Sequence, residues 1–186
     1  YRQFVILQQN GIYLVDKDGN LLPKFFFNPE LEPDGEEFDT EDQGMKGINL
    51  RSEPFFNRLK AGSTIAEVFS NESGEPSTPN FKAHVGDTVT IKVLMPADKP
   101  RASSFILHEH AHRQQTEDVN SEVIGTQGEV SVGGSYKQEI FRGAGGNQLK
   151  AGDYMYRSGN ITWDVESGMW GYVTVLDKES DEIEKL

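Results

Sequence analysis

The strongest constraint on the fold is a series of short apolar runs with alternating pattern, separated by turn signals about every ten residues. Residues 88–94 are the best example, because they alternate, carry β-branched side chains and follow the Gly86-Asp87 turn. This spacing is typical of an all-β sandwich or barrel. Further strands are expected at residues 4–7, 12–15, 104–112, 129–132, 136–141, 154–157 and 171–176.

Composition agrees with many short strands. The chain has 186 residues, of which 19 are Gly, 8 are Pro and 35% are hydrophobic, and its length fits one domain, or one domain with a long appendage. No run approaches the roughly 18 apolar residues that a membrane span requires. The sequence begins at Tyr1 without Met or a signal peptide, and we expect a mature form or a fragment.

The charge balance narrows the class of partner. With 30 acidic and 18 basic residues the net charge is −12, which argues against nucleic acid and anionic membranes. An acidic surface attracts metal cations, although in most acidic proteins it serves solubility. The chain has no Cys, so no thiolate ligates a metal anywhere in it.

Three regions are expected along the chain. Residues 1–80 hold N-terminal strands, with hairpin turns at 10–11 and 18–20 and an acidic loop over 30–42, and pack on the sandwich. Residues 81–177 form the core, and 178–186 form a charged tail or linker. In the acidic loop, Asp39, Glu41 and Asp42 offer hard oxygens for Ca²⁺ or Mn²⁺, but their spacing is not that of an EF-hand. A solvated charge run is the favoured interpretation.

Three segments of the core carry a family resemblance. The turn at residues 86–89 reads Gly-Asp-Thr-Val, and residues 104–110 resemble the motif "H-P-x-H-L-H-G-H". Residues 151–156, continued through Trp163 to 168–171, resemble "P-G-x-Y-x-Y-H-C-H-I-x-x-H-x-x-x-G-M". In this order and spacing the chain resembles a cupredoxin domain of the multicopper oxidases. The resemblance implies a cupredoxin-like Greek-key β-sandwich, here with a long N-terminal hairpin and an acidic loop.

Residues 42–55 extend the resemblance to large bacterial multicopper oxidase-like proteins, among them multidomain manganese oxidases. It implies copper as the cofactor, an extracytoplasmic location (secreted, periplasmic or at the cell surface) and other cupredoxin domains as partners. Oxidation of metals or phenols would be carried by those other domains.

The same resemblance shows which copper ligands are missing. A blue, type 1 site requires a thiolate, two imidazoles and a weak axial thioether. Only the axial Met has a counterpart, Met169, and we expect it to be a core residue without copper. For the oxygen-reducing trinuclear cluster, His108 matches a ligand while Ile106 replaces one, so we expect no catalytic residue in this chain. The replaced type 1 ligands fall on Ser103 and Asp164, and the H-C-H run falls on Ser158, Gly159 and Asn160.

Three of the four histidines alternate at 108, 110 and 112. If this run is a strand, the three imidazoles share one face about 6–7 Å apart, close enough to hold Cu(II), Zn(II) or Ni(II). The sequence therefore predicts a metal site at His108, His110 and His112. The alternative is a remnant of an ancestral copper site, now solvated or hydrogen-bonded. His84 fits a turn residue better than a ligand.

Three functions remain open. The first is a domain of a larger multicopper oxidase-like protein that lacks its own type 1 copper. The second is a stand-alone metal-binding module that uses the histidine run. The third is a cupin-like metalloenzyme, because His110-Ala111-His112 is followed by Glu117. Against this third possibility, Ser104 stands where cupins have Gly, and no His follows His112.

Overall fold

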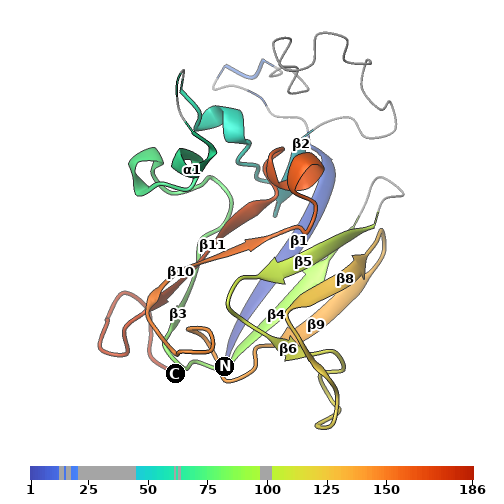
Figure 1. Cartoon of the computed structure of the whole chain (residues 1–186), viewed down its shortest axis with the longest axis vertical. Helices are drawn as coiled ribbons and strands as arrows, with labels where there is room; N and C mark the ends of the chain where they lie inside the picture. Colours follow the sequence, from blue (N-terminus) through green and yellow to red (C-terminus); the bar gives the residue numbers. More distant parts are fainter. Residues whose placement is uncertain (13–14, 16–17, 21–44, 61, 63, 97–101) are drawn as a thin grey trace.

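The chain folds as an all-β sandwich of two mixed sheets, as the alternating runs predicted (Figure 1). The computed structural model describes residues 1–12, 15, 18–20, 45–60, 62, 64–96 and 102–186. The four-stranded sheet has the order β2 (Met45–Ile48), β1 (Arg2–Ile12), β4 (Val89–Leu94), β9 (Ser135–Glu139). The five-stranded sheet has the order β3 (Phe81–His84), β11 (Trp170–Leu176), β10 (Gly152–Arg157), β5 (Ser103–Leu107), β8 (Thr126–Val130). A small two-stranded sheet pairs β6 (His112–Arg113) with β7 (Val123–Ile124).

Strands that are distant in sequence are neighbours in both sheets. β1 pairs with β4 in parallel, with Phe4 opposite Ile91, and β3 pairs with β11 in parallel. The chain passes from one sandwich sheet to the other after β2, β3, β4, β8 and β9. These crossings place the ends of β5, β10 and β11 close together, which builds the polar cluster described below.

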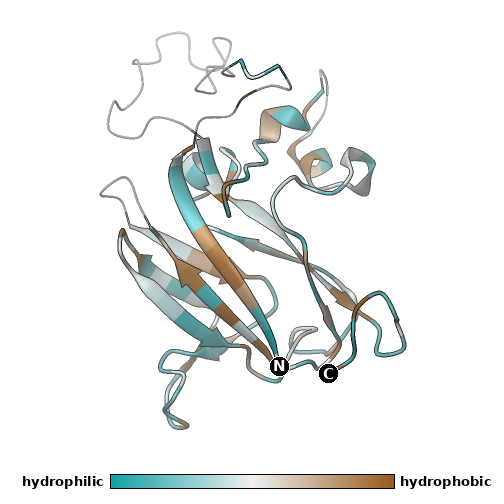
Figure 2. Ribbon diagram, turned by 180° about the vertical axis from the view of Figure 1, so that it is seen from behind, coloured by the Kyte–Doolittle hydropathy of each residue, from teal (hydrophilic) through white to brown (hydrophobic). Residues whose placement is uncertain are grey.

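The core lies between the sheets and includes the first strand. Alternate residues of each strand point inward, so Phe4, Ile6, Ile91 and Phe105 are all buried. Hydrophobic residues are concentrated along β1 and β4 in Figure 2. Tyr156 is fully buried, its hydroxyl donates to Pro79 O at 2.6 Å, and burial raises its pKa. β1 is therefore a strand of the sandwich itself, although it belongs to the region expected to pack on it.

The N-terminal hairpin has a different turn from the one the sequence suggested. β1 continues through Asn10 and Gly11, and its antiparallel partner is β2, which follows a long connection. Gly11 has a φ of 67°, and the register with β2 shifts between Gln9 and Ile12. The glycine thus relaxes a bulge in a long strand, and the interpretation of residues 10–11 as a turn was wrong. The acidic loop over 30–42 lies outside the described residues.

A second hydrophobic cluster lies on the outer face of the five-stranded sheet. The segment with η1 (Phe55–Asn57), α1 (Ile65–Val68) and η2 (Asn71–Ser73) lies over Trp170 of β11. Arg58 stacks on the Trp170 ring at 5.1 Å and donates to Glu53 at 2.9 Å. Glu53 also accepts from Ser77, so the buried ion pair has partners on both sides.

The C-terminal tail contains no helix over residues 177–186. Ser180 O lies 2.9 Å from His84 Nε2, and Lys82 forms an ion pair with Glu182 at 3.0 Å. No helix among the described residues has the length and hydrophobicity to cross a membrane. The division at residues 80 and 177 stays a prediction.

Candidate functional site

The histidine run is not one strand. β5 ends at Leu107, Glu109 adopts a φ of 60°, and β6 begins only at His112. A positive φ reverses the chain locally and breaks the two-residue alternation on which a shared face depends. The expectation that the three imidazoles lie on one strand face was therefore wrong, and each has surroundings of its own.

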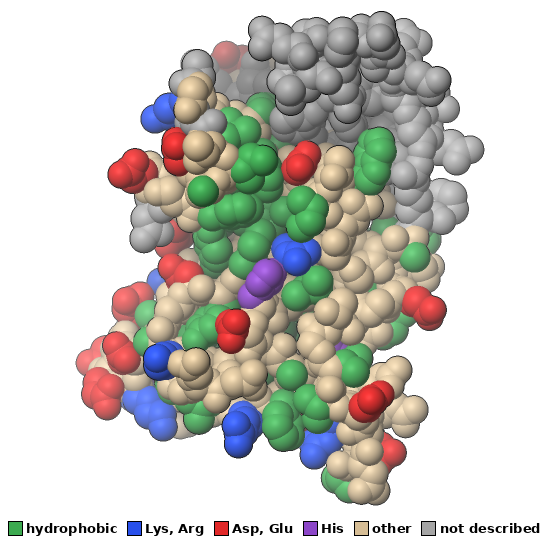
Figure 3. All heavy atoms as spheres, in the orientation of Figure 1, with side chains coloured by type: hydrophobic (Ala, Val, Ile, Leu, Met, Phe, Trp, Pro, Cys, Tyr) green, Lys and Arg blue, Asp and Glu red, His purple; other side chains and the backbone are tan. Residues whose placement is uncertain are grey.

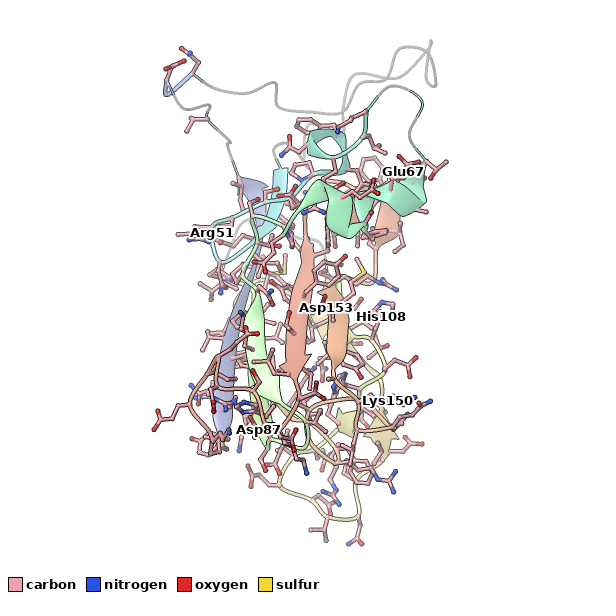
Figure 4. All side chains as sticks on the ribbon, turned by 90° about the vertical axis from the view of Figure 1, so that its left-hand side faces the viewer. Arg51, Glu67, Asp87, His108, Lys150 and Asp153 are labelled. Atoms are coloured by element: carbon pink, nitrogen blue, oxygen red, sulfur yellow. The ribbon has the colours of Figure 1, made fainter. Side chains whose placement is uncertain are left out.

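His108 is exposed and faces a guanidinium. Its Nε2 accepts a hydrogen bond from Arg157 Nε at 2.8 Å, because β5 and β10 pair with Arg157 opposite Ile106. Burial lowers the pKa of His108, and the positive charge of Arg157 lowers it further. Figure 4 shows His108 beside β10. The lone pair on His108 Nε2, which a metal ion would need, already accepts a hydrogen bond from the positively charged Arg157.

His110 is buried and has partners on both ring nitrogens. Its Nδ1 lies 2.8 Å from His108 O, while its Nε2 accepts from the backbone N–H groups of Gly145 and Gly146 at 3.1 and 3.0 Å. This pattern assigns the neutral Nδ1–H tautomer. Burial lowers the pKa of His110, which favours the same neutral form. His110 ties the end of β5 to the loop before β10.

His112 differs from its two neighbours. Its Nδ1 lies 3.0 Å from Arg113 O, and its buried Nε2 has no hydrogen-bond partner. Burial lowers the pKa of His112. Of the three predicted ligands it alone keeps an unoccupied imidazole lone pair. In the described part of the chain, no group of three or more His, Cys, Asp or Glu side chains is arranged to hold a metal.

The other candidates are partnered elsewhere. His84 contacts Arg2 through Nδ1 at 3.1 Å and Ser180 O through Nε2. Glu117, the candidate cupin ligand, is 86% exposed and accepts from Lys137 Nζ at 2.9 Å. Neither residue joins the histidine run into a cluster.

A closed polar cluster lies where β5, β10 and the following helix meet. Ser103 Oγ is 2.7 Å from Ser158 Oγ and 2.9 Å from Asp164 Oδ2, and Ser158 Oγ also bonds to Asp164 Oδ2. The backbone N–H of Asn160 donates to Ser158 Oγ at 3.3 Å. Ser158 is 0% and Asp164 is 8% exposed, so the cluster is shielded from water.

The short helix η3 (Ile161–Val165) aims Asp164 into this cluster. It is a π-helix whose i to i+5 bonds run from Val165 N to Asn160 O and from Glu166 N to Ile161 O. Gly159 faces the other way, because a Cβ there would lie 2.0 Å from Ser104 Oγ. The residue that meets Ser103 and Asp164 is Ser158, one position before the one aligned with the thiolate.

Arg157 is the residue of this region that the sequence did not single out. Nothing in its local pattern marks it, since its role depends on the register between β5 and β10. Figure 3 shows hydrophobic side chains gathered on the same face, over β10 and β11. Met155 of β10 is half-buried, and Ile161 and Trp163 of η3, the helix that follows β10, are exposed.

Comparison with known proteins gives the fold its class. No family model and no curated protein matches the sequence. A solved multicopper oxidase matches 94% of this chain with 15% identity and a TM-score of 0.53. The copper nitrite reductase from Nitrosomonas europaea matches 98% of it with 14% identity and a TM-score of 0.51. The fold is cupredoxin-like. The chain spans 44% of the length of each of these two structures.

Proposed function

We propose that the chain is a cupredoxin-like domain of a larger multicopper oxidase-like protein and has no type 1 copper of its own. Oxidation of metals or phenols is then carried by other domains, in an extracytoplasmic location. The observation that carries the proposal is the closed cluster of Ser103, Ser158 and Asp164. It lies where the sequence resemblance aligns the ligands of a type 1 site.

The chemistry of this cluster is unsuited to blue copper. Type 1 copper requires a soft thiolate and imidazoles, whereas two hydroxyls and one carboxylate are hard donors. Their hydrogen bonds are made with one another, so copper would have to break them within a buried site. Met169 is fully buried and belongs to the main core.

The counterpart of the trinuclear ligand is also blocked. His108 accepts from Arg157, so a metal ion at Nε2 would displace a hydrogen bond and then face a neighbouring positive charge. This supports a domain that has exchanged copper binding for internal hydrogen bonds.

Length and surface support a second domain as the partner. The two structural neighbours are more than twice as long as this chain, which covers 44% of each. The surface of η3, the helix that follows β10, exposes 41% of Trp163 and 45% of Ile161, side chains that stabilise an interface when covered. We assign contact with a sister cupredoxin domain to this face.

The test has two parts. Sequencing the gene on both sides of this chain should reveal an intact H-C-H-x-x-x-H-x-x-x-x-M run in another domain. After equilibrium dialysis of the purified chain against copper, metal analysis should find no copper bound in a one-to-one ratio at the cluster of Ser103, Ser158 and Asp164. A gene that encodes only this domain, or tight copper binding that Asp164→Ala removes, would overturn the proposal.

A stand-alone metal-binding module is the second candidate, and the free Nε2 of His112 favours it. Copper is its proposed metal, with His108, His110 and His112 as proposed ligands after rearrangement of the turn at Glu109. Calorimetric titration with Cu(II) tests it. Equal binding by the wild-type chain and a variant with all three histidines replaced by Ala would exclude this function.

A further inference from the structure

A small polar pocket opens between β6 and the loop that follows β9. Its volume is about 220 Å³, below the size of sites for larger organic ligands. β6 belongs to the small two-stranded sheet, whereas the closed polar cluster lies on the strands of the sandwich. The lining residues are Arg113, Thr116, Glu139, Ile140, Phe141 and Arg142.

Arg113, one of the lining residues, also carries an unsatisfied donor. Its Nε is buried and has no hydrogen-bond partner. The guanidinium lies over the Phe141 ring, 5.7 Å from the ring centre, which fixes its plane without occupying its N–H groups. Buried polar atoms are nearly always partnered in folded proteins, so an orphaned donor on an arginine that lines a cavity points to a missing acceptor beside that side chain.

Arg142 adds a second guanidinium to the same pocket. It sits in the left-handed region, with a φ of 69°, at the turn after Phe141. Although the chain has 30 acidic residues, no ion pair within 4.0 Å joins Glu139 of the rim to Arg113 or Arg142. Thr116 has already used its hydroxyl proton on Lys137 O at 2.7 Å, so the donors free to meet a ligand belong to the two arginines.

We propose that this pocket binds a small oxyanion, a carboxylate or a phosphate group, between Arg113 and Arg142. A guanidinium presents a planar fork of N–H donors that matches two oxygens of either group. Arg113, half-buried and lying over the Phe141 ring, supplies one fork, and Arg142, which is exposed, supplies the second. This site needs no metal and is independent of the function proposed above.

Isothermal calorimetry and thermal unfolding of the full chain test the proposal. Phosphate, sulfate, acetate and succinate are titrated at constant ionic strength, with chloride as the reference anion. At least one oxyanion should bind saturably and raise the melting temperature with its concentration, and the pair of phosphate and succinate identifies which group is preferred. Equal responses to all anions, chloride included, would show ionic strength alone and overturn the site.

Variants locate the binding. Arg113→Gln should weaken it about tenfold or more, and Arg113→Lys should recover little, because the fork and not the charge alone is required. Arg142→Gln should have a smaller effect. Arg51→Gln, at an exposed arginine beside β2, is the matched control and should bind as the wild type does.

Amide NMR spectra of the wild-type chain give a readout that needs no variant. Signals of residues 113 and 139–142 should move with the bound anion and saturate together. Perturbation elsewhere with these signals unmoved would exclude the pocket.

Discussion

Two polar regions at opposite ends of the sandwich differ in whether their buried atoms have partners. η3, which supplies Asp164, lies near the top of Figure 1, and β6, which supplies Arg113, lies near the bottom. Asp164 and both serines satisfy one another, while the Nε of Arg113 is orphaned. Satisfied buried polar groups hold a fold together, whereas an unsatisfied donor on a side chain that lines a pocket can gain an acceptor from a ligand. Both regions contain buried polar atoms, so it is the presence or absence of hydrogen-bond partners that distinguishes the structural cluster from the candidate site.

The largest effect is expected from breaking the closed cluster. Asp164→Ala removes the acceptor that Ser103 and Ser158 share; the two hydroxyls can still bond to each other, but one donor loses its acceptor and a cavity is left, which together cost about 3 kcal/mol of the free energy of unfolding. Urea denaturation monitored by Trp fluorescence measures it. Asp177→Ala, at an exposed carboxylate, should change the free energy by less than about 0.5 kcal/mol. Equal midpoints for these two variants would show that the cluster is not a structural support.

The closed cluster and the histidine run also show what the sequence could predict. Alternation located β4, β9, β10 and β11 closely, because β-branched runs between turns depend on local pattern. It failed after Leu107, where the backbone turns at Glu109. The sequence aligned the thiolate with Gly159, whereas the residue whose side chain joins Ser103 and Asp164 is Ser158. Contacts such as that between Arg157 and His108 depend on strand register, which no single-strand pattern contains.

Stability should fall in mild acid because of the buried imidazoles. The pKa of His110 is lowered from its ordinary value of 6.5 by burial, so below pH 6.5 the unfolded chain binds the proton more readily than the folded chain. The stabilisation is fully present above pH 6.5 and is lost as pH falls toward the folded pKa, at up to about 1.4 kcal/mol per pH unit for each such group. The pKa of His112 is also lowered by burial, so this residue contributes a loss of stability in acid as well.

Denaturation curves between pH 7.5 and 5 measure this slope. His110→Gln should make the dependence of stability on pH less steep, because one titrating group is lost. It should also lower the stability at pH 7.5, since two backbone N–H groups lose their acceptor. A wild-type stability that is flat over this range would contradict the neutral, partnered state of His110.

Removing the cation beside His108 should change a pKa with a modest effect on folding. Arg157→Gln abolishes the positive charge that lowers the pKa of His108, although burial, the larger cause, remains. The pKa of His108 should therefore rise part of the way toward 6.5, and the imidazole lone pair should become available to Cu(II). Imidazole NMR titration with and without Cu(II) measures both. An unchanged pKa would mean that the guanidinium does not act on this ring.

The smallest effect is expected at the open pocket, in contrast to the cluster at the other end. Arg113→Met keeps the contact with Phe141 but removes a buried donor that has no partner, so the anion-free chain should change by less than about 1 kcal/mol, in the direction of greater stability. Urea denaturation in an oxyanion-free buffer measures it. A loss as large as that of Asp164→Ala would mean that Arg113 is part of the scaffold. The lack of a partner for Arg113 Nε would then no longer distinguish the pocket from the structural cluster.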